Sequence, residues 1–429
     1  MIDMLLLFRK KTTVIARSML PVICLLMLIS VNPLYARTVA SSELTLLGRG
    51  WSSSEKYPVT FGRVPTRLMG NFNEYAAAQS QCSSGMAFYF STNSRNIGAN
   101  YTLWANISMP HQAATGTRGL DLYMYDTLKE SWVYLSTHKP ATTMSQTANF
   151  GLNLDGSFHD FMIYLPLYDG VKDFSLVVDD NAQVKAGNTA YCDPSKRILV
   201  YGTSITQGAC ASRPGMAGTS LLGRKLKSHV FNFGFSSGGR IELTAAEALS
   251  EIKDISVYVI DVVPNASAPL LYSNLYDFVS ILLKANPGAS FIFVEALDAA
   301  YAAYNEENWS REPDNRRLRL EVDRLRADYP TRKFELVSAS EFSDPESEGT
   351  VDGIHYTDLG FMLWTRALTP VVRKFLDKST GVGSAETDSE AYPVAYYDLQ
   401  GRRLAAPAEG LNIELMSDGS VRKSVQTQK

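Results

Sequence analysis

The chain is organised around Ile198-Leu-Val-Tyr-Gly-Thr-Ser-Ile-Thr-Gln-Gly208. The apolar residues from Ile198 to Tyr201 are long enough for a strand, and the polar turn after Gly202 opens into a predicted helix. A strand that stops at Gly-x-Ser places the serine at the carboxyl edge of a sheet, where open α/β folds hold their ligands. Ser204 is therefore a candidate nucleophile, and the alternative is a serine that only caps the following helix.

Residues 191–378 alternate between predicted strands and predicted helices. Apolar runs without polar alternation suit parallel strands buried on both faces, and they lie at 198–201, 230–233, 256–263 and 290–294. Helical stretches follow them at 219–227, 243–251, 270–284 and 314–329. The alternation predicts an α/β domain of three layers, with a parallel sheet between two layers of helices.

Residues 43–190 have the pattern of an antiparallel β-sandwich or jelly roll. Short aromatic and β-branched runs are separated by Gly, Pro, Asn and Asp turns, and no helical period of useful length interrupts them. Trp104 and Trp132 of this region are candidates for stacking on sugars, although aromatic side chains of a sandwich more often belong to its core.

The two ends of the chain differ from these domains. Residues 1–36 have basic residues, then an apolar run, then small residues, which predicts a secretory signal cleaved after Ala36 or Ala40. An uncleaved membrane anchor is the alternative, but the run is short for a membrane span. We therefore expect an exported protein (periplasmic, cell-surface or secreted) without a stable membrane span. Residues 379–429 are predicted to be a linker and a short tail of two or three strands.

Composition and charge exclude other classes of protein. The hydrophobic content of 45% is typical of a globular chain, and a net charge of -3 offers no basic surface for a nucleic-acid partner. Cys82, Cys192 and Cys210 remain after the signal, and their spacing fixes no disulfide pair and suggests no metal site. We expect all three to be buried. The oligomeric state is left open.

A serine nucleophile needs a base, and His355 is the best placed of five histidines. It follows Asp352 in Asp-Gly-Ile-His, so the carboxylate can hold the imidazole in the correct tautomer. Asp358 is a rival orienter, although its position at the start of the last helix suits capping better. The other histidines are His111, His138, His159 and His229, and His229 is the next candidate base.

Donors for a developing oxyanion are predicted on two further loops. The glycine-rich loop at 232–240 follows the second apolar run, and its N–H groups can point into the same site. Asn265 follows the third run and brings a side-chain amide.

Together these four blocks resemble the SGNH hydrolases, the GDSL-like esterase and lipase superfamily, over about residues 197–376. The resemblance implies a flavodoxin-like α/β/α fold and a serine esterase that uses no metal and no organic cofactor. It implies Ser204 as nucleophile and oxyanion donor, His355 as base, Asp352 as its orienter and Asn265 as a side-chain donor. Ser237 and Gly238 are implied as oxyanion or substrate-binding positions.

The chain departs from the superfamily in three places. Thr203 stands where many members have aspartate, and Tyr356 stands where this branch often has proline. Ser237 stands where the second block usually supplies a glycine, so its N–H can serve only if the loop's φ angle permits.

Two further resemblances concern the flanking regions. Gly119-Leu-Asp-Leu-Tyr123 resembles a Gly-x-Asp-Leu-Tyr element of an N-terminal β domain that precedes SGNH domains in bacterial secreted proteins. Residues 396–402 resemble tails of Bacteroidetes surface and secreted proteins, some of which are sorting signals. We therefore expect an esterase for short acyl esters, O-acetyl above all, on a glycan or small molecule. The alternatives are a lipase or lysophospholipase, and a non-catalytic carbohydrate-binding protein with an esterase-like fold.

Overall fold

The computed structural model describes residues 36–305, 309–376, 393–398, 402–404, 406–408, 410–416 and 421–426. The expected signal, apart from residue 36, and the expected linker at 379–392 lie outside these residues. The chain divides into two compact units, residues 1–379 and 380–429. Among the helices in the described ranges, none is long and apolar enough to cross a membrane.

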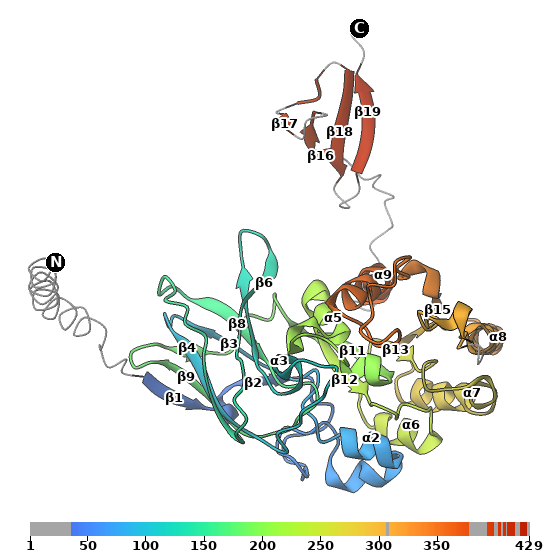
Figure 1. The fold of residues 1–429 in the computed structure, drawn as a ribbon, viewed down its shortest axis with the longest axis horizontal. Helices are drawn as coiled ribbons and strands as arrows, with labels where there is room; N and C mark the ends of the chain where they lie inside the picture. The colour runs from blue at the N-terminus through green and yellow to red at the C-terminus, as the bar shows by residue number, and fades with distance from the viewer. Residues whose placement is uncertain are drawn as a thin grey trace, which may run out of the picture. The chain divides into compact units, whose positions relative to one another are not determined.

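The N-terminal half of the first unit is a sandwich of two antiparallel sheets, as predicted (Figure 1). One sheet has the order β1-β9-β4-β7, with β1 (Ala36–Ala40), β4 (Ile97–Leu103), β7 (Ser145–Asn149) and β9 (Val171–Asp179). The other has the order β10-β3-β8-β5-β6, with β3 (Ala87–Thr92), β5 (Asp121–Asp126), β6 (Ser131–Thr137), β8 (His159–Tyr164) and β10 (Val184–Lys185), and β2 (Thr45–Leu47) pairs with β3. Alternate side chains of both sheets meet in one core, where the rings of Phe88 and Phe174 stack at 4.1 Å.

Two features of the sandwich differ from the expectation. Its first strand lies before residue 43, because β1 pairs with β9 and buries Val39 in the core. Short helices also interrupt the strands: α2 (Glu74–Gln79), α3 (Ala114–Thr117) and the 3-10 turns η1 (Ser41–Glu43) and η2 (Thr66–Asn71). Helices of one or two turns show no helical period in a sequence.

The second half of this unit is the predicted α/β domain. Its parallel sheet has the order β12-β11-β13-β14-β15, with β11 (Asp193–Gly202), β12 (Ser228–Gly234), β13 (Val257–Asp261), β14 (Ser290–Val294) and β15 (Phe334–Val337). The helices are α4 (Ser204–Gln207), α5 (Gly218–Leu226), α6 (Leu243–Leu249), α7 (Ala268–Ala285), α8 (Glu312–Asp328) and α9 (Asp358–Leu376). The 3-10 turns are η3 (Pro214–Met216), η4 (Ala302–Tyr304) and η5 (Ala339–Glu341).

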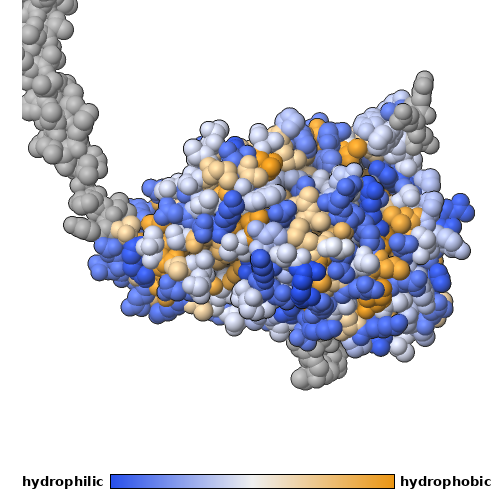
Figure 2. Space-filling view, turned by 90° about the horizontal axis from the view of Figure 1, so that it is seen from below, coloured by the Kyte–Doolittle hydropathy of each residue, from blue (hydrophilic) through white to orange (hydrophobic). Residues whose placement is uncertain are grey.

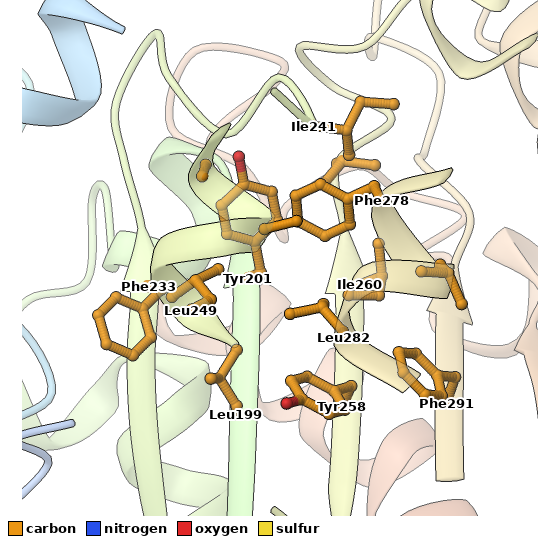
Figure 3. Packing of buried hydrophobic residues seen from close by; sticks show 14 of the residues in the cluster. Leu199, Tyr201, Phe233, Ile241, Leu249, Tyr258, Ile260, Phe278, Leu282 and Phe291 are labelled. Atoms are coloured by element: carbon orange, nitrogen blue, oxygen red, sulfur yellow. The ribbon is translucent and has the colours of Figure 1, made fainter. Parts of the chain in front are cut away.

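Side chains of successive residues in the parallel strands point alternately to the two faces of the sheet, and a hydrophobic core lies on each face. One face packs against α6, α7 and α8, and the other against α5 and α9. Figure 3 shows the first core, in which Leu199 and Tyr201 of β11 pack with Phe278 and Leu282 of α7. The strands are buried on both faces, which explains their unbroken apolar sequence.

The sandwich and the α/β domain share buried contacts. Asp121, from the Gly-x-Asp-Leu-Tyr element, accepts hydrogen bonds from Arg213 Nη1 and from the Gly215 N–H, both at 2.8 Å. Tyr123 of the same element accepts a hydrogen bond from Arg213. This element therefore joins the sandwich to the loop that follows α4.

The second unit is a small antiparallel sheet of order β17-β16-β18-β19. Its strands are β16 (Pro393–Tyr397), β17 (Arg403–Leu404), β18 (Gly410–Met416) and β19 (Val421–Gln426), where two or three were expected. On the face of the molecule seen in Figure 2, hydrophilic residues predominate and hydrophobic residues occur in small separate groups.

Candidate active site

Ser204 lies at the carboxyl end of β11, at the first residue of α4, and is 8% exposed. Thr203 caps this helix through a hydrogen bond from Ile205 N–H to its Oγ1, so the threonine that replaces the usual aspartate has a local role. The sharp turn needs Gly202, because a Cβ there would lie 2.1 Å from Thr206 Oγ1. The sequence therefore folds into a tight strand-to-helix turn that presents the serine.

A continuous chain of hydrogen bonds joins the three residues expected to act together. Ser204 Oγ lies 2.9 Å from His355 Nε2, and His355 Nδ1 lies 2.7 Å from Asp352 Oδ2. The other carboxylate oxygen of Asp352 accepts the backbone N–H groups of Ile354 and His355. The Asp-Gly-x-His spacing thus closes a turn that points both side chains toward the serine.

The charge of Asp352 is stabilised by this turn. Partial burial raises the pKa of its carboxyl, but hydrogen bonds from the side chain and backbone of His355 outweigh burial and lower the pKa below its ordinary value. The carboxylate is therefore ionised at neutral pH and can hold a proton on His355 Nδ1.

In the loop at 235–239, two backbone N–H groups, those of Ser237 and Gly239, have no described acceptor. Ser237 has a φ of 58°, the left-handed region that the usual glycine would favour, and the structure describes no acceptor for its N–H. The Gly238 N–H donates to Phe235 O at 2.9 Å, so in this structure it is not free to bind an oxyanion. Its carbonyl accepts one N–H of the Asn265 amide at 2.6 Å, which ties this side chain to the loop.

The rival residues have other partners. Asp358 accepts hydrogen bonds from the backbone N–H and the hydroxyl of Ser212, at 2.9 and 2.5 Å, and begins α9. His229 lies at the start of β12, the end of the strand away from Ser204, and accepts the Gly48 N–H at 2.8 Å. Burial, helped by the Arg197 charge, lowers the pKa of His229 to about 4.

Two residues near the site were not singled out from the sequence. His111, on a loop of the sandwich, is exposed and its ring centre lies 6.0 Å from that of His355. Asp261, at the end of β13, is 3% exposed and accepts a hydrogen bond from Thr206. The position of Asp261 at the end of a predicted strand is a signal by which it could have been found. Nothing in the sequence around His111 relates it to the loop that carries His355.

Two cavities lie beside the loop that carries Asp352 and His355. The smaller, of about 10 Å³, is lined by the neighbours of the candidate residues, Ile205, Pro264 and Ile354, together with Ala296, Leu297, Ala299, Arg311 and Tyr356. The larger, of about 530 Å³, shares Ala296, Leu297, Ala299 and Tyr356 with it and adds polar residues, among them Asp298, Arg319, Ser338 and Asp344.

Cys82, Cys192 and Cys210 are buried and unpaired. Burial raises the pKa of each thiol to about 12. In the part of the chain that the structure describes, no group of three or more His, Cys, Asp or Glu residues is placed to hold a metal ion. Trp132 is half-buried and packs edge-on against Tyr89 and Tyr125.

The chain matches two protein-family models. Residues 195–373 match the GDSL-like lipase/acylhydrolase family, and residues 36–184 match the N-terminal domain of SGNH-hydrolase-type esterases. No curated protein matches the chain.

Several solved structures have the same architecture. A Bacteroides ovatus protein described as a GDSL-like lipase is 28% identical, with a TM-score of 0.72, over 80% of this chain and 98% of that one. The salicylyl-acyltransferase SsfX3 of a tetracycline biosynthetic pathway is 14% identical, with a TM-score of 0.61, over 81% and 98%. An acetyl xylan esterase from the rumen bacterium Butyrivibrio proteoclasticus is 9% identical, with a TM-score of 0.51, over 80% and 99%. At the last two identities only the fold is shared. The two family matches, the fold and the Bacteroides ovatus structure agree: residues 195–373 form a GDSL-like lipase/acylhydrolase domain, residues 36–184 form the N-terminal domain of SGNH-hydrolase-type esterases, and the chain is an esterase of the SGNH type.

Proposed function

We propose that this protein is an exported serine esterase that removes short acyl groups, O-acetyl above all, from carbohydrate. Ser204 is the nucleophile, His355 the base and Asp352 the residue that orients the base. The observation that carries the proposal is the hydrogen-bond chain from Ser204 Oγ through the His355 ring to the Asp352 carboxylate, at 2.9 and 2.7 Å.

In the proposed reaction, Ser204 Oγ attacks the ester carbonyl carbon while its proton passes to His355 Nε2. The N–H groups of Ser204 and Ser237 and the Asn265 amide stabilise the negative carbonyl oxygen. The bond to the alcohol oxygen then breaks, and the imidazolium proton goes to that oxygen. Water attacks the acyl-serine, gives a proton to His355 and releases the carboxylic acid as Ser204 regains its hydroxyl proton.

The size of the smaller cavity favours a short acyl group. Its volume of about 10 Å³ is close to that of a single water-sized probe, and its walls are mainly apolar. A methyl group suits such a space, whereas a lipase or lysophospholipase needs room for a long chain. Three of its lining residues, Ile205, Pro264 and Ile354, are sequence neighbours of Ser204, Asn265 and His355, which supports this space as the site of the acyl methyl group in the proposal.

The larger cavity favours a hydroxyl-rich alcohol. Its volume of about 530 Å³ is in the range of small-molecule sites, and carboxylates, serines and an arginine line it. Such groups hydrogen-bond sugar hydroxyls. The solved acetyl xylan esterase of the same fold acts on an acetylated glycan by its name, and we extend that substrate class to this chain as part of the proposal.

A substrate screen with matched variants tests the proposal. The full chain is assayed on p-nitrophenyl acetate, butyrate and octanoate and on acetylated xylan. We expect Ser204→Ala and His355→Ala each to lower kcat by roughly 10⁴-fold, and Asn265→Ala by about 10²- to 10³-fold. His159→Ala is the control, because His159 also contacts an aspartate, Asp155, but on the sandwich.

Three results would count against the proposal. Full activity of Ser204→Ala or His355→Ala contradicts the catalytic assignment. A preference for octanoate over acetate contradicts the short acyl group. Acetate release from p-nitrophenyl acetate but from no acetylated glycan contradicts the carbohydrate assignment.

Export is the part of the proposal that rests on residues 1–36. Cleavage after Ala36 keeps nearly all of β1, whereas cleavage after Ala40 removes a strand that buries Val39. We therefore expect the mature chain to begin at Arg37. N-terminal sequencing of the exported protein tests this, and a chain that still begins at Met1 contradicts cleavage.

A further inference from the structure

The loop at 235–239, which we call the oxyanion loop, rests on a segment of the N-terminal half, residues 63–85, which we call the backing segment. Val64, Leu68, Phe72 and Ala76 of the backing segment belong to the same buried core as Phe235. β12, which leads into the oxyanion loop, is an edge strand of the parallel sheet. The N-terminal half therefore supplies apolar cover that the α/β domain lacks at this edge, and Figure 1 shows α2 next to α6 there.

Arg63 is the most unusual residue of the backing segment. Its side chain is 1% exposed, and among the described residues no carboxylate lies within ion-pair distance. Its nitrogens donate to four backbone carbonyls, those of Gln79, Cys82, Asn232 and Gly234, at 2.7, 3.1, 3.1 and 2.6 Å. A buried cation is costly to desolvate, so its retention needs a reason besides stability.

Two successive peptide units before Ser237 are each held by hydrogen bonds. The peptide between Gly234 and Phe235 is held at both ends, since its carbonyl accepts from Arg63 and its N–H donates to Gly202 O at 3.0 Å. The next peptide is also held, because the Ser236 N–H donates to Gln207 and Phe235 O accepts from Gly238. The first N–H after these two is that of Ser237, which, like the Gly239 N–H, has no described acceptor.

Two contacts extend this support. Gln207 Nε2 donates to Gln79 Oε1 at 2.9 Å, so the glutamine that holds Ser236 is itself held by the backing segment. A Cβ at Gly238 would lie 2.9 Å from the Ala76 Cβ, so α2 lies directly against the loop. The Arg63 guanidinium also lies 4.7 Å from the centre of the Phe235 ring.

We infer that Arg63 is a positioning residue of the reaction: it fixes the peptide before the oxyanion loop and thereby aims the Ser237 N–H at the substrate carbonyl oxygen. The N-terminal half is then part of the catalytic machinery, and the α/β domain carries an incomplete oxyanion hole without it. This inference rests on the proposed function, because it takes Ser237 as an oxyanion donor.

The test compares Arg63→Met with Arg67→Met in the full chain. Methionine is unbranched and replaces the aliphatic part of the arginine side chain, but it donates no hydrogen bond. Arg67 lies on the same segment and pairs with Glu55 and Glu251, away from the oxyanion loop. We expect Arg63→Met to lower kcat on p-nitrophenyl acetate by roughly 10²-fold with KM within about threefold, as for a misplaced catalytic group. We expect Arg67→Met to keep the wild-type kcat.

Near-ultraviolet circular dichroism and the melting temperature show whether each variant is folded. A folded Arg63→Met with wild-type kcat overturns the inference, and so does a rise in KM at constant kcat. If Arg63→Met does not fold, Arg63→Lys replaces it, since lysine keeps the positive charge but cannot donate to all four carbonyls of Gln79, Cys82, Asn232 and Gly234. A fall in kcat of fivefold or more at constant KM then supports the inference, and an unchanged kcat overturns it.

A fluorophosphonate probe separates this inference from the proposed function. The probe labels an activated serine and uses the same oxyanion donors, but it needs no particular ester substrate. If wild-type protein is labelled at Ser204 and Arg63→Met is labelled roughly 10²-fold more slowly, the inference holds even if the substrate assignment fails. Equal labelling rates overturn the inference, and labelling that survives Ser204→Ala contradicts the proposed nucleophile.

Discussion

Replacing Asp261 with asparagine should make the protein more stable, and by an amount that grows with pH. Asp261 is buried at the end of β13, and its described side-chain partner is the Thr206 hydroxyl, at 3.1 Å. Burial raises the pKa of Asp261 from 3.8 to about 7, and the Thr206 hydrogen bond offsets only part of this rise. At a pH between these two values, the Asp261 carboxyl is therefore protonated in the native state and ionised in the unfolded chain.

The sign and size follow from this difference in pKa. Between pH 3.8 and about 7 the unfolded state binds fewer protons than the native state, so the stability due to this group falls as pH rises. Each unit of pKa is about 1.4 kcal/mol, so two units between pH 5 and pH 7 lower the free energy of unfolding by about 3 kcal/mol. Above pH 7 the loss is complete. Asparagine has the shape of the neutral acid and does not titrate. The free energy of unfolding of Asp261→Asn therefore does not fall with pH through this group.

Urea unfolding of both proteins at pH 5 and pH 8.5 measures the effect. Taking the difference between the two proteins cancels the contribution of every other titrating group to the free energy of unfolding. We expect the advantage of Asp261→Asn to be larger at pH 8.5 than at pH 5 by about 3 kcal/mol. An advantage that is the same at both pH values would show that Asp261 ionises in the native state as it does in the unfolded chain, and would refute the reasoning.

Two further substitutions test the loops around the nucleophile. Ser237→Gly keeps the backbone N–H and relieves a φ of 58°, so we expect wild-type kcat and a gain in stability of up to about 1 kcal/mol, measured by urea unfolding. A large loss of kcat would mean that the serine side chain itself acts on the substrate. Leu297→Ala removes part of the wall of the smaller cavity, so we expect the ratio of kcat/KM for p-nitrophenyl butyrate to that for acetate to rise roughly tenfold. An unchanged ratio would mean that the acyl group binds elsewhere.

The sequence predicted the layers of the fold because the signals for them are local. Residues 291–294 are all apolar and follow Ser290, and the strand observed there, Ser290–Val294, has the predicted bounds. β15 was not predicted because it is a short edge strand that contains the half-buried Glu335. Its sequence therefore has no unbroken apolar run that would indicate a buried strand. The three residues of the hydrogen-bond chain were also predictable, since Ser204 follows a strand and the Asp352–His355 turn is compact.

The features of the site that the sequence did not predict depend on contacts between residues far apart in the chain. Arg63 meets Gly234, and His111 lies near His355, across long stretches of chain that share no periodic pattern. The hydrogen bond of the Gly238 N–H could not be predicted for a related reason. Which N–H of a glycine-rich loop stays free depends on how the loop turns, and Ser237 adopts the left-handed conformation although it has a side chain.

The three buried thiols have a consequence for how this chain is made. Each lies in a different part of the fold, and burial keeps each protonated at neutral pH, so none is a ready partner for thiol–disulfide exchange. A chain exported as proposed passes from a reducing to an oxidising compartment. Because its described cysteines form no disulfide, the described fold requires neither a thiol oxidase nor a disulfide isomerase in order to form.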